Sequence, residues 1–77
     1  MMMYKDLEKY MGRKVKVQTQ RYGFEFLNEG TYFATGISKE MLANDDNVVK
    51  TILRVKITPD FKSTSNIWVA AEEVELI

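Results

Sequence analysis

The chain contains no cysteine and no histidine. Without cysteine it can form no disulfide framework, no thiolate zinc site and no cysteine nucleophile. Without histidine it lacks the commonest general base, the commonest metal ligand and every Ser-His or Cys-His catalytic pair. Small secreted domains usually depend on disulfides, so the lack of cysteine also favours a reducing cytoplasm. The two absences predict a protein that is not an enzyme and that holds no metal or other cofactor.

Neither sign of charge predominates, since Lys and Arg together number 11 and Asp and Glu also number 11. This balance argues against a non-specific nucleic-acid coat protein, which needs a sustained positive field. No apolar run approaches the ~20 residues of a membrane-spanning helix. Tyr4, Lys5 and Asp6 directly follow the first methionines, so no signal-peptide apolar region is seen. The sequence predicts a soluble, cytoplasmic protein without a membrane partner.

The chain is short, with 77 residues, of which 45% are hydrophobic and 12% aromatic. That composition is globular, and the length predicts one domain over residues 1–77. A chain of this size buries only ~60% of the surface that its unfolded form exposes. Because so small a core gives modest stability, association into a homo-oligomer is expected.

The first twelve residues have the pattern of a short amphipathic α-helix. Tyr4, Leu7 and Met11 fall on one helical stripe, and Gly12 supplies a left-handed stop. The stripe is expected either to cover one open end of the remaining domain or to dock on a neighbouring subunit.

Four segments have the alternation or composition of β-strands, and they are residues 13–20, 24–27, 31–37 and 48–58. Ser38 is expected to cap a single helical turn over residues 39–43, which would bury Met41 or Leu42. The acidic loop at residues 44–47 lacks the spacing of a calcium loop and is interpreted as a solvated turn. A polar connection is expected at residues 61–66.

The last eleven residues form the most informative segment. Ile67 and Val69 alternate as in a short strand, and so do Val74 and Leu76. The residues between them, 70–72, are too few for an ordinary helix but enough for one tight turn. The sequence therefore predicts a strand, one helical turn and a final short strand.

The order of these elements resembles the SH3-like and Sm-like small barrels. The specific likenesses are "GRKVKVQTQ" after a short helix and "WVAAEEVELI" at the close. The resemblance implies a mainly β fold, with a short N-terminal α-helix at residues 1–12 and a five-stranded small barrel at residues 13–77. It also implies that one long, strongly bent strand, here residues 48–58, is shared by two sheets.

Three apolar side chains fall on the outward faces of their predicted strands, namely Val48, Ile52 and Trp68. Exposed apolar patches mark interfaces, so these residues and Tyr22 are candidate anchors for a protein partner. Two other outcomes fit the same pattern: the N-terminal helix covers the patch, or a second copy of the chain does.

Basic residues form a second candidate surface, and its members are Lys14, Lys16, Arg21, Lys50, Arg54 and Lys56. Tyr22, Phe24 and Trp68 could serve as stacking platforms beside them, as in barrels that hold single-stranded nucleic acid. The alternative is that these side chains only keep an exposed strand soluble and discourage edge pairing.

The favoured hypothesis is a non-enzymatic protein-binding or assembly module, for example a phage-type inhibitor that occludes a partner's surface. The first alternative is binding of single-stranded RNA or DNA on the basic face. The second alternative is a trap for a small anionic ligand at a subunit interface. It rests on the aromatic residues Tyr4, Tyr10, Tyr22, Phe24, Phe26, Tyr32, Phe33, Phe61 and Trp68 beside Arg and Lys.

Overall fold

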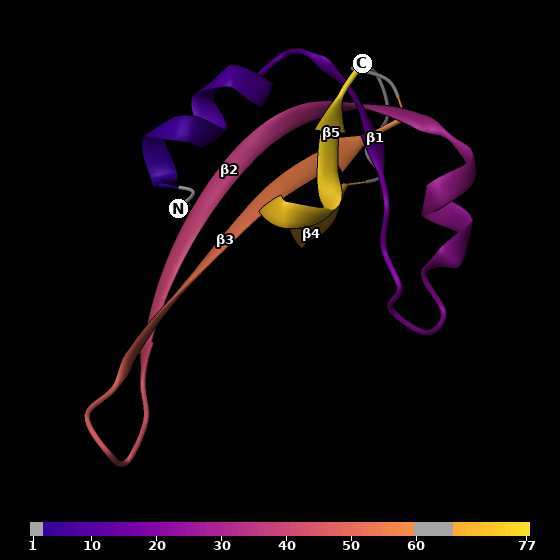
Figure 1. Ribbon diagram of the computed structural model, residues 1–77. Coiled ribbons are helices and arrows are strands. Elements are labelled where there is room, and N and C mark those ends of the chain that lie inside the picture. The colour runs from indigo at the N-terminus through magenta and orange to yellow at the C-terminus, as the bar shows by residue number, and fades with distance from the viewer. Residues whose placement is uncertain (1–2, 60–65) are drawn as a thin grey trace.

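A computed structural model of the chain describes residues 3–59 and 66–77 (Figure 1). The elements in order are η1 (Tyr4–Tyr10), β1 (Lys14–Val17), η2 (Glu25–Glu29), β2 (Thr31–Ala43), β3 (Val49–Thr58), β4 (Ile67–Ala70), η3 (Ala71–Glu73) and β5 (Val74–Leu76). The five strands form one antiparallel sheet in the order β4-β3-β2-β1-β5. The prediction of a mainly β protein is therefore confirmed. None of the helices in the described ranges is long and apolar enough to cross a bilayer.

The sheet curls strongly. β4 and β5 lie at its opposite edges, yet the three residues of η3 join them directly. The two edges must therefore approach each other at this turn. The described residues contain no ladder between β4 and β5, so the structure shows an open sheet and not a closed barrel. The predicted strand, single turn and final strand at the end of the chain are confirmed.

The core lies on the inner face of this curled sheet. Val15 and Val17 of β1, Val55 and Ile57 of β3, and Val69 of β4 are all buried. Their spacing by two along each strand directs these side chains to one face, as a strand requires. The core also contains Leu7, Tyr10, Leu27, Ala34, Ala71 and Val74.

The N-terminal segment is a 3₁₀-helix, so the prediction of an α-helix is wrong. A 3₁₀-helix has three residues per turn and aligns residues i and i+3. Leu7 and Tyr10 therefore share the buried face, whereas Met11 is 43% exposed. η1 packs on β2, and the hydroxyl of Tyr10 donates to the carbonyl of Val74 on β5 at 3.5 Å.

The second predicted strand, residues 24–27, is also wrong, because this segment belongs to the 3₁₀-helix η2. Phe24 and Phe26 suggested a strand by alternating. The structure instead buries Leu27 and half-buries Phe24, three positions apart, which is the 3₁₀ period. The N–H of Leu27 donates to the carbonyl of Phe24 at 3.0 Å and starts this turn.

The third predicted strand is too short, and the helical turn predicted over residues 39–43 is wrong. β2 continues to Ala43 because residues 36–43 pair with residues 49–56 of β3. The long strand predicted at residues 48–58 is confirmed by β3, which begins at Val49, but β3 belongs to the single five-stranded sheet, so the prediction that two sheets share it is wrong. The irregularity in this pair lies in β2, where the register shifts between Ala34 and Gly36. Of the polar connection predicted at 61–66, only Asn66 lies within the described residues.

Candidate protein-docking surface

The outer half of the β2–β3 hairpin projects from the rest of the molecule. We call residues 38–54 the arm. In Figure 1 the arm extends to the lower left, away from β1, β4 and β5, and every residue from 39 to 51 is exposed. The molecule is accordingly elongated, with extents of 42 × 28 × 23 Å. None of the fully buried core residues belongs to the arm, and within the arm only Leu53, at its base, packs against that core.

The arm has two strand edges that other strands leave open in the described part of the chain. β1 pairs with β2 only at residues 31–33, and an isolated bridge joins Met11 to Ala34. β4 pairs with β3 only at residues 54–57, because the chain turns into η3 after Ala70. Residues 37–43 of β2 and 49–53 of β3 thus present edges without a neighbouring strand. Such edges are templates for pairing with another chain.

Apolar side chains are exposed along the same arm. Met41 is 61% exposed, and Leu42, Val48 and Val49 are also exposed. An open, mainly apolar hollow of about 400 Å³ is lined by Leu42, Ala43, Asn44, Val48, Val49 and Lys50. Open edges beside apolar side chains are the combination that favours contact with a protein.

The tip of the arm is ordered by one asparagine. The side-chain oxygen of Asn44 accepts from the N–H groups of Asp46 at 2.9 Å and Val48 at 3.0 Å. Asn47 adopts a left-handed conformation with φ of 61°, which asparagine tolerates better than most residues. The acidic loop is a hydrogen-bonded turn, and the described residues contain no cluster of acidic side chains able to hold a metal ion.

Trp68 and Lys56 form a contact at the base of the arm. They are directly opposite on β4 and β3, on the outer face of the sheet, and the Lys56 ammonium lies 5.6 Å from the Trp68 ring centroid. Gly36 gives the lysine room, because a Cβ there would lie 3.1 Å from Lys56 Cε. Trp68 remains 42% exposed.

The four predicted interface residues do not form one patch. Val48 and Ile52 belong to the arm, and Trp68 lies beside its base on the same outer face as Ile52. Tyr22, which is 96% exposed, belongs to the loop before η2 and not to the arm. The arm therefore carries Val48 and Ile52, and Trp68 lies close to its base.

The predicted basic surface is divided. Lys14 and Lys16 lie on β1, whereas Lys50, Arg54 and Lys56 lie on β3, and β2 separates these strands. Arg54 is also partly neutralised, because its guanidinium lies 2.6 Å from the Glu40 carboxylate. A continuous positive stripe is thus not formed.

Arg21 lies apart from the other basic residues, in an aromatic cluster next to η2. Its guanidinium is 4.4 Å from the Phe24 ring centroid, and Phe24 stacks on Phe26 with centroids 6.4 Å apart. Tyr22 and Phe26 are exposed beside them. The cluster holds the loop against η2 and leaves two aromatic faces open to solvent.

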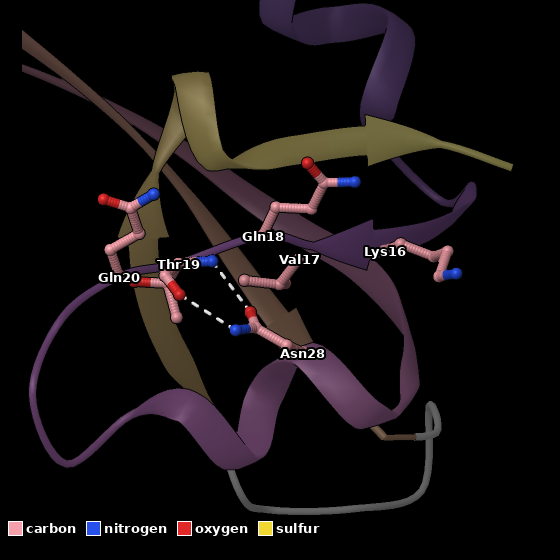
Figure 2. Close-up of a pocket in the computed structure, with 6 residues that line it drawn as sticks. All are labelled: Lys16, Val17, Gln18, Thr19, Gln20 and Asn28. Carbon is pink, nitrogen blue, oxygen red and sulfur yellow. Dashed lines mark hydrogen bonds between the residues drawn. The ribbon is translucent and has the colours of Figure 1, made fainter.

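A polar hollow lies where the chain leaves β1 (Figure 2). It measures about 340 Å³ and is lined by Lys16, Val17, Gln18, Thr19, Gln20 and Asn28. Figure 2 shows that the Asn28 side chain turns inward to the backbone of Thr19. Gln18 is engaged as well, with its amide donating to the Glu75 carboxylate at 3.1 Å. The side chains of Asn28 and Gln18 are thus already engaged in hydrogen bonds within the chain.

Sequence reasoning missed Met41, Leu42 and Val49 as exposed arm residues. Residues 39–43 lack strand alternation and have a composition suited to a helix, so a buried turn was the natural interpretation. The sequence held one signal for these residues. The strand predicted at 48–58 is long, and a long strand needs a partner strand of similar length.

Comparison of the chain with protein-family models, curated proteins and solved structures gives no match.

Proposed function

We propose that this chain is a protein-binding and assembly module whose contact surface is the β2–β3 arm. One observation carries the proposal: the arm exposes two unpaired strand edges together with apolar side chains that the core does not use. A hairpin without a third strand is at best marginally stable in water. A partner strand that pairs with one edge of the arm would therefore stabilise the arm by giving it a third strand.

The mode of binding is strand addition. An extended segment of the partner pairs with the arm backbone, and its alternate side chains contact Met41, Leu42 or Val49. Hydrogen bonds along the strand supply affinity, and the side-chain contacts supply specificity. A partner segment captured in this way is occluded, which is how an inhibitor of the phage type would act.

We also propose that the domain is related to the SH3-like or Sm-like small barrels, as a curled sheet with that strand order that stays open between β4 and β5. Support comes from the sheet order β4-β3-β2-β1-β5 and from the single turn of η3 between the two edge strands. Fold alone does not determine function, so the proposed activity rests on the arm.

The other two hypotheses have less support. Single-stranded nucleic acid needs a positive groove beside stacking aromatics, but β2 separates the basic residues of β1 from those of β3. An anionic ligand trap needs aromatic and basic side chains around a deep pocket. The hollow nearest Lys16 is open and polar, and Phe61 lies outside the described residues.

A shortened arm tests the proposal. Replacing residues 41–51 by Asn-Gly connects Glu40 and Ile52, which are cross-strand neighbours, by a two-residue turn. The variant should unfold cooperatively with little loss of stability, because the removed residues are exposed. Thermal unfolding checks that the fold is retained.

Binding is then measured with a displayed library of random peptides, selected on the intact chain and re-tested on the shortened one. We expect the selected peptides to be extended, with alternating apolar residues, and to lose binding when the arm is shortened. Peptides that bind both chains equally, or a library that yields no binder, would contradict the proposed role of the arm.

A further inference from the structure

We propose that the arm takes up an extended segment of a partner protein in which acidic residues alternate with apolar ones, and that this segment pairs with the open edge of β3. The inference rests on the proposed function of the arm as a contact surface. It goes further by naming the edge and the chemistry of the partner.

The open part of the β3 edge is short and lies in line with β4. β4 occupies the edge from Arg54 to Ile57, and the chain turns into η3 after Ala70. Residues 49–53 continue the same edge without a neighbouring strand in the described part of the chain. A strand added here therefore extends the sheet beyond the end of β4.

β3 presents different chemistry on its two faces. Lys50, Arg54 and Lys56 share the outer face, because they are separated by even numbers of residues and successive side chains of a strand point to opposite sides. On the inner face, Val55 is buried and Leu53 packs against the core. β3 is thus a strand with a basic outer face and an apolar inner face.

β1 has the same pattern, and its pairing with β5 shows which kind of strand completes such an edge. The lysines of β1 are exposed and its valines are buried. β5 places Glu75 directly opposite Lys16 and Leu76 directly opposite Val15. Opposite charges and apolar pairs across neighbouring strands both stabilise a sheet. Within this chain, a strand of alternating acidic and apolar residues therefore pairs with a strand of alternating basic and apolar ones.

The outer face of the β3 edge lacks an acidic residue opposite its lysine. Among the described residues the one ion pair joins Arg54 to Glu40 at 2.6 Å, and the exposed Lys50 has no acidic partner. An acidic residue opposite Lys50 in an added strand supplies that partner. Another one opposite Ile52 lies diagonal to Lys50 and Arg54, within reach of their long side chains. The aspartates in the turn at residues 44–47 disfavour further acidic residues toward the tip.

The inward side of an added strand meets apolar side chains. Val49 and Leu53 share the inner face with Met41 of β2, which lies directly opposite Thr51. Val49 and Met41 are exposed, and Leu53 reaches the core. Apolar residues at the inward positions of the partner therefore continue the face that forms the core.

The β2 edge does not favour such a partner. Its open residues, 37–43, contain one lysine and one glutamate, Lys39 and Glu40, so this edge has no net charge. An acidic strand there would lie beside Glu40 on the outer face, and like charges on neighbouring strands are destabilising. The open β3 residues, 49–53, carry a positive charge alone. Charge therefore directs an acidic strand to β3.

Two synthetic peptides test the charge of the partner. One alternates glutamate with valine and the other alternates lysine with valine, so they differ in the sign of their charge. We expect the intact chain to bind the glutamate peptide about fivefold more tightly or better, and the chain with the shortened arm to bind neither. Because salt screens surface charges, the preference should fall as the salt concentration is raised. Fluorescence anisotropy of labelled peptides measures the dissociation constants.

Lys50→Glu and Lys39→Glu are a matched pair of variants. Both lysines are exposed and each substitution changes the net charge equally, but Lys50 lies on the β3 edge and Lys39 on β2. Lys50→Glu should weaken binding of the glutamate peptide about fivefold or more and strengthen binding of the lysine peptide. Lys39→Glu should change both affinities much less. Thermal unfolding checks that each variant is folded.

The outcomes separate the inference from the proposed function. A glutamate peptide that binds no better than the lysine peptide, or that loses as much affinity with Lys39→Glu as with Lys50→Glu, overturns the acidic partner on β3. Self-association of the intact chain but not of the shortened one, measured by light scattering, would place a second copy on the arm and overturn it as well. In each case the arm's role as a contact surface stands or falls with the peptide library.

Discussion

Asn28 binds Thr19 in the way that a neighbouring strand would. Its side-chain oxygen accepts from the Thr19 N–H at 2.7 Å, and its side-chain nitrogen donates to the Thr19 carbonyl at 2.9 Å (Figure 2). Thr19 is only 4% exposed. One amide thus satisfies both backbone groups of a buried residue just beyond the end of β1.

Asn28→Ala should lower the free energy of unfolding by about 1–3 kcal/mol, because it leaves the two backbone groups of Thr19 without partners. Gln20→Ala is the matched control, since Gln20 lines the same hollow and is exposed. It should change stability by less than ~0.5 kcal/mol. Urea denaturation measures both, and equal effects would show that the pairing contributes nothing.

η1 should be an integral part of the fold and not a detachable segment. Leu7 is fully buried, so Leu7→Ala should cost about 2–5 kcal/mol. Met11→Ala removes a largely exposed side chain and should cost much less. The comparison uses guanidinium denaturation, and similar losses for both variants would mean that η1 does not pack as described.

Gly12→Ala should destabilise the protein through its backbone alone. Gly12 has a φ of +73°, and a Cβ there would meet no atom within 4 Å. The left-handed conformation costs an ordinary L-residue about 1–2 kcal/mol. Gly12→Asn should lose less, since asparagine adopts this conformation more readily. Thermal unfolding ranks the stability of the wild type, Gly12→Ala and Gly12→Asn. If Gly12→Ala is as stable as the wild type, the backbone argument is wrong.

Lys56 and Trp68 should show a small but measurable coupling. A double-mutant cycle with Lys56→Ala and Trp68→Ala should give ~0.5–1 kcal/mol, as for cation–π pairs at exposed sites. Chemical denaturation of the four chains provides the values. A coupling near zero would mean that the ammonium does not interact with the ring in solution.

The sequence predicts the strands with clear alternation and fails where a longer-range contact decides the conformation. Residues 13–20 alternate plainly, and burial follows that alternation from Val15 to Thr19, although the strand β1 covers only Lys14–Val17. The strand, single turn and strand predicted within residues 67–77 are confirmed. Residues 39–43 favour a helix by composition, but pairing with β3 makes them a strand. η1 was predicted as an α-helix and η2 as a strand, because the 3₁₀ spacing of three is close to the period of an amphipathic α-helix and Phe24 and Phe26 alternate as in a strand.

The candidate surface was predictable only in part for the same reason. Val48, Ile52 and Trp68 were identified from their outward register. Met41 and Leu42 could not be identified from the sequence, because their exposure depends on how far β2 extends beyond β1. That extent is set by pairing between segments, and local sequence does not contain it.

The curled sheet also has a consequence for how the chain reaches its native state. β5 pairs with β1, and Tyr10 contacts Val74, 64 positions away. Contacts between such distant segments require closing a large loop before they return any stabilisation, so folding is expected on the millisecond-to-second scale of high-contact-order proteins. During that interval the edge of β1 is unpaired and prone to aggregation. The eleven residues from Ile67 onward, which form both outer strands of the sheet, therefore determine how long the edge of β1 stays unpaired during folding.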